Sequence, residues 1–379
     1  MKLFDVYPVY PIEPVKAKGS YIWDKDNNQY LDLYGGHAVI SIGHSHPAYI
    51  ETIKNQLEKI AFYSNSVEIP LQNILAEKLG KLSGYETYNL FLCNSGAEAN
   101  ENALKLASFK TNKSKVLAFK GGFHGRTSGA VAITDNAKII APFNSKHQVE
   151  LVDWNDIEAA ETALKQGDVC AVIAEGIQGL AGINLPEPNF FIGLHDLCKK
   201  YGALLILDEV QSGYGRTGKF FAHQHYGVIP DIITMAKGMG NGFPIGGIII
   251  NPTIEASYGL LGTTFGGNHL ACAAAIAVLD VLESENLIQH AADLETKQND
   301  LFKNTKGLKA IRNKGLMTGL EFEFPIKELR GKLVTEHKIF TGSSANPNTL
   351  RLLPPLCIEE KQLNFFKEKL DLALKNSNI

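Results

Sequence analysis

The stretch Ala203-Leu-Leu-Ile-Leu-Asp-Glu-Val-Gln211 runs through five apolar residues and then into an acidic pair. Such a short, wholly apolar run is typical of a strand that is buried on both faces, as in a parallel sheet covered by helices. A carboxylate at the end of a buried strand needs a partner, because an unpaired buried charge is costly. Metal ligation, a capping role and pairing with a cofactor nitrogen are all open to Asp208 on this reasoning.

Similar apolar runs alternate with helical patterns over the middle of the chain. This alternation predicts an α/β fold, in which a large, mostly parallel sheet carries helices on both faces. The other apolar runs lie at 90–93, 115–119, 170–174, 232–236 and 245–250, and the clearest helical patterns lie at 97–110, 190–201 and 268–283.

The two ends of the chain differ from this middle part. Residues 21–32 have the pattern of a hairpin with Asp and Asn at its turn. Near the other end, an amphipathic helix precedes short strands and a last helix at 359–374. We expect an N-terminal segment at 1–49, a large α/β domain at 50–270, and a linking helix with C-terminal elements at 271–379. The two ends should together form one smaller α+β domain.

The composition disfavours several classes of protein. With 37 Lys and Arg against 40 Asp and Glu, the net charge of −3 provides no basic field for nucleic acid. No apolar run approaches the roughly 18 residues of a membrane-spanning helix, and the first residues lack the apolar region of a signal peptide. The five cysteines are scattered, which fits reduced thiols. We expect a cytoplasmic protein without a nucleic-acid or membrane partner.

Asn94-Ser-Gly-Ala-Glu-Ala-Asn100 lies between the strand at 90–93 and the following helix. Its small residues let the backbone approach a ligand, and the free amides and dipole of a helix start favour an anion such as phosphate. A plain N-capped helix start is the alternative interpretation.

Met235-Ala-Lys-Gly-Met-Gly-Asn-Gly-Phe-Pro244 again follows an apolar strand. A lysine between such a strand and a glycine-rich turn is a candidate for a desolvated, nucleophilic amine, although most lysines are simply exposed. An anion site, a strand-end Asp and a strand-end Lys together suit pyridoxal 5′-phosphate (PLP). This cofactor needs a phosphate site, a carboxylate for its ring nitrogen and a lysine for its aldehyde.

Two other interpretations are weaker. Gly213-Tyr-Gly-Arg-Thr-Gly218 matches the dinucleotide motif of NAD-dependent oxidoreductases, but five residues separate its first glycine from the strand, where a tight turn is needed. The pairs His44/His46 and His223/His225 lack a carboxylate or cysteine in ligand register, so no metal is expected.

Several motifs, in order over essentially the whole chain, resemble those of the class III (subgroup II) aminotransferases. The resemblance implies the PLP-dependent fold type I and transfer of the δ-amino group of N-acetylornithine to 2-oxoglutarate. The products would be N-acetylglutamate semialdehyde and glutamate, in arginine biosynthesis. N-succinylornithine, ornithine, lysine and 4-aminobutyrate are alternative donors; an NAD-dependent oxidoreductase and a non-enzymatic binding module are more remote alternatives. The motifs are Leu92–Glu101, Gly122–Thr127, Leu207–Gly218, Met235–Gly238 and Thr264–Asn268.

The same resemblance implies roles around the cofactor. Lys237 would bond covalently to the cofactor's aldehyde and then act as the general acid and base, and Asp208 would pair with the ring nitrogen. Thr264 would reach the phosphate of the neighbouring subunit, which implies a homodimer. The remaining cofactor contacts would come from Ser95, Gly96 and Ala97 at the phosphate, from Phe123 and Val210 on the two ring faces, and from Gln211 at the 3′-oxygen.

Substrate carboxylates would bind two arginines, since a guanidinium fork suits a bidentate contact. By resemblance, Arg126 takes the α-carboxylate of the acylated ornithine, and Arg351 takes a carboxylate of 2-oxoglutarate or glutamate. Glu175 would mask Arg351 when the ω-amine donor is bound.

The chain also departs from the usual family pattern. Leu180-Ala-Gly182 stands where Glu-Gly-Gly is usual, and Glu175-Gly176 replaces Glu-Pro. Asn268-His269 replaces Asn-Pro, and Tyr34–Ala38 replaces a more usual Ser-Gly-Ile-Ala. None of these changes touches Lys237 or Asp208, so they leave the chemistry in place and the acyl group of the donor open.

Overall fold

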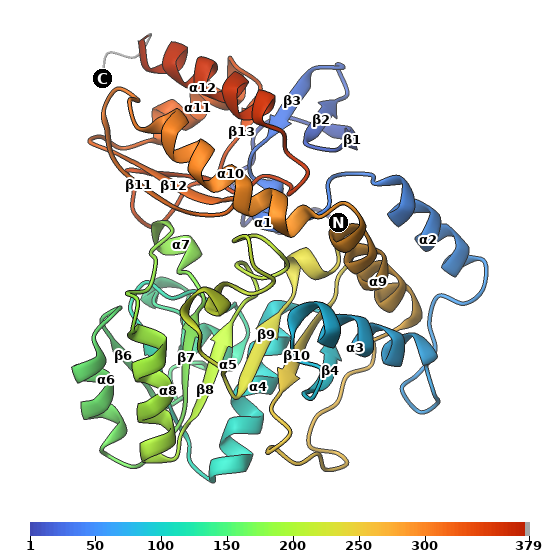
Figure 1. Ribbon diagram of the computed structural model, residues 1–379, viewed down its shortest axis with the longest axis vertical. Coiled ribbons are helices and arrows are strands. Elements are labelled where there is room, and N and C mark those ends of the chain that lie inside the picture. The colour runs from blue at the N-terminus through green and yellow to red at the C-terminus, as the bar shows by residue number, and fades with distance from the viewer. Residues whose placement is uncertain (376–379) are drawn as a thin grey trace.

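The computed structural model describes residues 1–375, and its largest element is a seven-stranded sheet (Figure 1). The strand order is β4-β10-β9-β8-β7-β5-β6, and neighbours are parallel except that β10 is antiparallel to both β4 and β9. The predicted α/β fold with a mostly parallel sheet is confirmed. The strands are β4 (Asn89–Cys93), β5 (Lys115–Phe119), β6 (Val149–Val152), β7 (Val169–Glu175), β8 (Leu204–Asp208), β9 (Ile232–Met235) and β10 (Gly246–Ile250).

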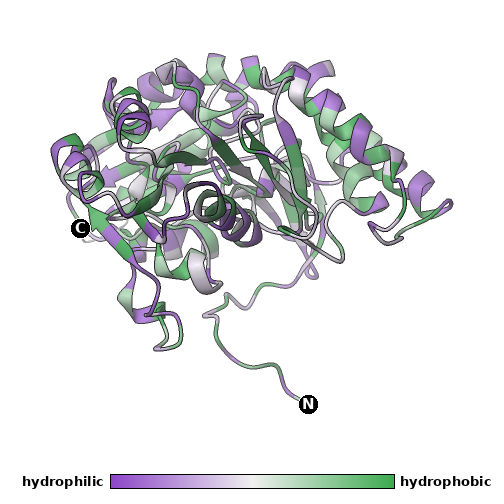
Figure 2. Cartoon of the chain, turned by 90° about the horizontal axis from the view of Figure 1, so that it is seen from below, coloured by the Kyte–Doolittle hydropathy of each residue, from purple (hydrophilic) through white to green (hydrophobic). Residues whose placement is uncertain are grey.

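Helices cover both faces of this sheet, because successive side chains of a strand point to opposite sides. On β7, Ala171 and Ile173 belong to the apolar cluster under α4 (Gly96–Thr111). Val172 and Ala174 belong instead to the cluster under α6 (Ile157–Leu164) and α8 (Phe190–Tyr201). Figure 2 shows the apolar strands enclosed between these layers, with an extended N-terminal segment leading away. The sheet is therefore a rigid support buried on both faces.

The remaining helices flank the sheet or connect its strands. Helices α2 and α3 both pack on α9, which follows the sheet. The longer ones are α2 (Pro47–Leu57), α3 (Pro70–Ser83) and α9 (His269–Ser284), and the short ones are α1 (Gly35–Ala38), α5 (Ser128–Ala132), α7 (Gly179–Gly182), η1 (Ala137–Ile139), η2 (Ala222–Tyr226) and η3 (Lys237–Met239).

The two ends of the chain meet in two further sheets. The predicted hairpin forms β2 and β3, and β3 pairs in parallel with β13 from the other end of the chain. Figure 1 shows the N-terminal strands beside the C-terminal helices. The domain boundaries at 49/50 and 270/271 stay predictions. The elements are β1 (Pro14–Lys18), β2 (Tyr21–Asp24), β3 (Gln29–Asp32), β11 (Leu308–Lys314), β12 (Met317–Phe322), β13 (Ile339–Phe340), β14 (Thr349–Leu352), α10 (Leu287–Phe302), α11 (Lys327–Thr335) and α12 (Glu360–Lys375).

Some elements were not predicted from the sequence. Strand β6 lies at the sheet edge and is mostly half-buried, so it lacks the apolar run of the central strands. The reversed direction of β10 depends on its neighbours and leaves no trace in its own five residues. Within residues 1–375, no helix is long and apolar enough to cross a membrane.

Candidate active site

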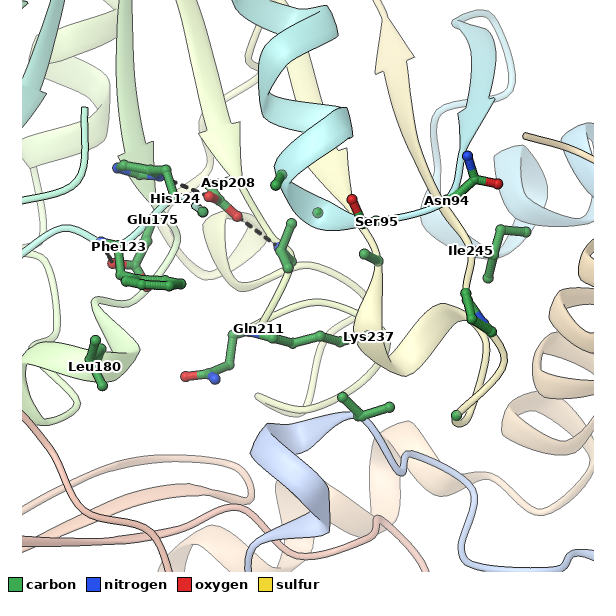
Figure 3. A pocket seen from close by; sticks show the side chains of 18 of the residues that line it. Asn94, Ser95, Phe123, His124, Glu175, Leu180, Asp208, Gln211, Lys237 and Ile245 are labelled. Carbon is green, nitrogen blue, oxygen red and sulfur yellow. Dashed lines mark hydrogen bonds and ion pairs between the residues drawn. The ribbon is translucent and has the colours of Figure 1, made fainter. Parts of the chain in front are cut away.

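A cavity of about 290 Å³ lies at the edge of the large sheet where the parallel strands end (Figure 3). In open α/β sheets this edge is where ligands bind. Nine of the twelve predicted site residues line the cavity, and they come from five separate segments of the chain. These nine are Ser95, Gly96, Ala97, Phe123, Glu175, Asp208, Val210, Gln211 and Lys237.

Asp208 ends β8 and is buried at the base of the cavity. Its Oδ2 accepts hydrogen bonds from Nδ1 of His124 and Nδ2 of Asn100, each at 2.8 Å. Its Oδ1 accepts from the amide of Val210 at 3.0 Å. Asp208 therefore caps the turn that follows β8, as considered from the sequence. It also has a partner that can carry a positive charge, His124. The three donors hold the carboxylate in one orientation at the cavity wall.

His124 is the charged partner of Asp208. Burial by itself lowers the pKa of His124, but the hydrogen bond and charge of Asp208 raise the pKa above its ordinary value. The geometry therefore favours an ion pair between His124 and Asp208, in which each buried group compensates the other. Neither His124 nor Asn100 was predicted from the sequence to be a site residue. Both lie inside quoted motifs, but their meeting with Asp208 depends on the sheet.

Lys237 is the first residue of η3. A single residue, Ala236, separates it from the end of β9. Its backbone has φ of +43°, a left-handed conformation that costs energy for a residue with a Cβ. Within residues 1–375, Nζ of Lys237 has no hydrogen-bond or ion-pair partner. Burial lowers the pKa of this amine, and the charge of Arg351 adds to that effect while Asp208 and Glu175 oppose it. The result is an available amine with increased nucleophilic character.

The start of α4 forms another wall of the cavity. Ser95 is the N-cap, and its Oγ accepts from the amide of Glu98 at 3.2 Å. The first amides of the helix, those of Gly96 and Ala97, have no intrahelical acceptor and lie at the positive end of the helix dipole. A Cβ on Gly96 would lie 2.6 Å from Cγ1 of Val210, so only glycine fits between this helix start and that side chain. The wall suits a phosphate group.

Gln211 connects the cavity to Arg351. Nε2 of Gln211 donates to the carbonyl of His37 at 3.2 Å, and Oε1 accepts from Nη1 of Arg351 at 3.3 Å. Arg351 lies on β14 and is buried. Arg351, the predicted carboxylate site, therefore lies next to the cavity, behind Gln211, which lines it.

Glu175, at the end of β7, does not form an ion pair with Arg351. Its Oε1 accepts from the amide of Phe123 and its Oε2 from the amide of Gly179, each at 3.0 Å. Burial raises the pKa of Glu175 to about 7, with the charge of Asp208 adding to this and His124 opposing it. The predicted contact between Glu175 and Arg351 is absent from this conformation.

Arg126 and Thr264 do not line the cavity. Both are exposed, and Thr264 borders a separate hollow with Asn94 and Glu98. Their proposed contacts with substrate and with the phosphate of a neighbouring subunit stay predictions.

The donor set fits pyridoxal phosphate. An available lysine amine, a fixed carboxylate and a glycine-lined helix start face the same cavity, as each functional part of this cofactor requires. Within residues 1–375, no group of three or more His, Cys, Asp or Glu side chains could hold a metal ion.

Comparisons with known proteins agree with this chemistry. The family "Aminotransferase class-III" matches residues 5–374. Acetylornithine aminotransferase of Bacillus subtilis (strain 168) is 40% identical over 378 residues, covering 98% of this chain and 97% of that protein. The enzyme of the same name from Methanopyrus kandleri is 39% identical, with the same coverage of both chains.

Solved structures of similar proteins share the fold. Ornithine aminotransferase of Toxoplasma gondii superposes with a TM-score of 0.91 at 30% identity, covering 97% of this chain and 91% of that one. Another structure of that enzyme contains PLP at partial occupancy in its active site. Acetylornithine aminotransferase of Elizabethkingia anophelis has a TM-score of 0.84 at 29% identity and covers 98% and 95% of the two chains.

Proposed function

The chain belongs to the class III aminotransferases, which are PLP-dependent enzymes of fold type I, and we propose that it transfers the δ-amino group of N-acetylornithine to 2-oxoglutarate. The δ-carbon of the donor exchanges its nitrogen for an oxygen and becomes the aldehyde of N-acetylglutamate semialdehyde. C2 of 2-oxoglutarate exchanges its oxygen for that nitrogen and becomes the amino-bearing carbon of glutamate. The full-length similarity to enzymes named for acetylornithine is the observation that carries this donor.

The residues around the cavity support a division of labour. PLP, when bound through Lys237, supplies a ring that withdraws electrons from the reacting carbon. We assign the phosphate to Ser95 and to the amides of Gly96 and Ala97. Asp208, held by its three donors, would keep the proton on the ring nitrogen. Nζ of Lys237, once released from the cofactor, would carry the proton to and from the reacting carbon.

The other cofactor contacts are assigned from the cavity lining. Phe123 and Val210 both line the cavity and would enclose the ring, which excludes water from the reacting centre. Gln211 would hold the 3′-oxygen. These assignments rest on the family motif and on the position of each side chain.

Substrate carboxylates are assigned to the two arginines. Arg351 lies behind Gln211 and would bind a carboxylate of 2-oxoglutarate or glutamate. Arg126, on the exposed side of the segment that carries Phe123, would bind the α-carboxylate of the acylated ornithine. Glu175 would line the donor side of the cavity.

We also propose a homodimer that acts in the cytoplasm, in arginine biosynthesis. Thr264 is exposed and borders the same hollow as Asn94, the residue that precedes the assigned phosphate site. From there Thr264 would reach the cofactor of a second copy. The five cysteines are all free thiols, as expected in a reducing compartment.

Free ornithine is the second candidate donor, because solved ornithine aminotransferases superpose closely on this chain. Glutamate formation should be measured with 2-oxoglutarate and, in turn, N-acetylornithine, N-succinylornithine, ornithine and 4-aminobutyrate. The proposal expects the largest kcat/KM for an acylated ornithine. A clear preference for free ornithine or 4-aminobutyrate would contradict it.

A further inference from the structure

Arg351 is a buried cation without a carboxylate partner. It is 2% exposed, Nε donates to the carbonyl of Ser343 at 2.6 Å, and Nη1 donates to Oε1 of Gln211 at 3.3 Å. In the described part of the chain, no carboxylate forms an ion pair with Arg351, and nothing accepts from its Nη2. A buried guanidinium without an anion is costly, so this site is prepared for a carboxylate that a ligand supplies.

The acidic side chain expected to neutralise Arg351 is bound elsewhere. Both carboxylate oxygens of Glu175 accept amide hydrogen bonds, from Phe123 and Gly179. Burial also raises the pKa of Glu175 to about 7, so a part of its population is uncharged at neutral pH. Moving Glu175 to Arg351 would leave two amides without acceptors at the cavity wall.

Leu180 lies between the two segments that hold Arg351. Its carbonyl accepts from the amide of Ala345 at 2.8 Å, two residues after Ser343. On the other side of Leu180, the preceding residue Gly179 packs closely against Gln211. A Cβ on Gly179 would lie 1.9 Å from Oε1 of Gln211. Figure 3 shows Leu180 on the same side of the cavity as Gln211. An apolar side chain therefore occupies the stretch of wall where the family usually has glutamate.

Arg351 is also close to the reacting amine. Gln211 lines the cavity together with Lys237 and touches Arg351 directly. Burial lowers the pKa of Lys237, and the charge of Arg351 is near enough to lower it further. We therefore assign to Arg351 a substrate carboxylate that lies close to the reacting carbon. Glutamate carries a carboxylate on its reacting carbon, whereas the δ-carbon of N-acetylornithine carries none.

We propose that Leu180 is a specificity-determining residue that leaves Arg351 open to a substrate carboxylate throughout the catalytic cycle. This inference rests on the proposed aminotransferase function and deepens it. Without an internal carboxylate to displace, the half-reaction with glutamate gains the full interaction with Arg351. The ω-amine donor leaves the arginine unpaired, so the chain favours the amino acid whose reacting carbon carries a carboxylate.

The test compares Leu180→Glu with the matched neutral variant Leu180→Gln in the holoenzyme. Leu180 is 36% exposed, so the wall tolerates a polar side chain. Each half-reaction should be followed separately, through the absorbance change of bound cofactor, with glutamate alone and with N-acetylornithine alone. The inhibition constant of glutarate, a dicarboxylate without an amino group, gives a reading of Arg351 that needs no turnover.

The proposal expects Leu180→Glu to lower kcat/KM for glutamate by at least about tenfold and to raise the inhibition constant of glutarate similarly, because the new carboxylate competes for Arg351. The value for N-acetylornithine should fall less than that for glutamate, or rise. Leu180→Gln, which adds no charge, should lower the value for glutamate less than Leu180→Glu does. Equal effects of the two variants, or equal losses with both substrates, would overturn the proposal.

The same experiment separates this inference from the proposed donor. A wild-type enzyme that reacts with glutamate but with no acylated ornithine contradicts the proposed donor, while the glutamate and glutarate measurements on Leu180→Glu still decide the role of Leu180. A wild-type enzyme that uses N-acetylornithine, together with an unchanged glutamate half-reaction in Leu180→Glu, overturns the inference alone.

Discussion

Nδ1 of His124 lies 2.8 Å from Oδ2 of Asp208, and both side chains are buried beneath the cavity. Their pairing raises the pKa of His124 and places a positive charge behind the carboxylate that we assign to the ring nitrogen of the cofactor. We therefore propose that His124 acts through Asp208 as a positioning residue, because its charge offsets that of the buried carboxylate.

His124→Gln should therefore weaken cofactor binding and catalysis. Glutamine can still donate to Asp208 but brings no charge, so the buried carboxylate loses the cation beside it. We expect kcat/KM and the affinity for PLP each to fall by at least about tenfold. Asn100→Ala removes a neutral donor from the same oxygen and should lower both values less. Wild-type values of kcat/KM and PLP affinity in His124→Gln would contradict this role.

Lys237→Ala should abolish transamination and covalent attachment of the cofactor while the chain still folds. Nζ of Lys237 has no hydrogen-bond or ion-pair partner among residues 1–375, so its removal takes no contact of this kind from the fold. Borohydride reduction of the wild-type holoenzyme, followed by peptide mapping, should label Lys237. Lys219→Ala, which changes an exposed lysine, serves as the control. Labelling at any other lysine would refute the assignment.

Gly96→Ala should weaken cofactor binding for a steric reason. The new Cβ would lie 2.6 Å from Cγ1 of Val210, so the helix start and the cavity wall would move apart and displace the phosphate amides. We expect at least a tenfold weaker affinity for PLP, or about 1.4 kcal/mol. The double variant Gly96→Ala/Val210→Ala removes the clash and should bind PLP nearly as tightly as Val210→Ala alone, measured by cofactor titration. A double variant about tenfold weaker than Val210→Ala would point to another cause.

Residues whose surroundings are local in sequence could be predicted from the sequence. Asp208 ends the otherwise apolar strand β8, and Lys237 comes shortly after β9, which is apolar except for Thr234. Because parallel strands end at one edge of a sheet, their meeting follows from the sequence pattern. His124 could not be assigned in this way, because its hydrogen bond joins residues 84 positions apart. That contact exists only because β5, which precedes His124, lies beside β7, next to β8.

Glu175, which the family pattern would place on Arg351 when the ω-amine donor is bound, contacts other groups in this conformation. Both residues lie near the cavity, but the free amides of Phe123 and Gly179 satisfy Glu175 locally. Local hydrogen bonds of this kind depend on backbone direction, which residue identity does not reveal. The replacement of glutamate by Leu180 was visible in the sequence, and its meaning became clear only with Arg351 placed behind Gln211.

Glu175→Gln should change how stability depends on pH. The pKa of Glu175 in the folded chain is raised from 4.5 to about 7, chiefly by burial. Between these two values the unfolded chain loses its proton while the folded chain keeps it, so the free energy of unfolding falls as pH rises from about 4.5 to about 7. Above pH 7 both states are ionised and the loss, on the order of 3 kcal/mol, is complete.

Glutamine does not titrate, so the variant should escape this loss, although its amide can accept only one of the two backbone hydrogen bonds. The free energy of unfolding should be measured with urea at pH 5 and pH 8. Relative to wild type, the free energy of unfolding of the variant should be higher at pH 8 than at pH 5, by up to about 3 kcal/mol. Glu161→Gln is the control, because hydrogen bonds from Lys200 and Tyr201 lower the pKa of Glu161 to about 2 and keep it ionised over this range. Its effect should be nearly the same at both pH values. The difference in free energy of unfolding between Glu175→Gln and wild type could instead be the same at both pH values. The carboxylate would then already be ionised at pH 5, because the hydrogen bonds from the amides of Phe123 and Gly179 stabilise its charge more than burial destabilises it.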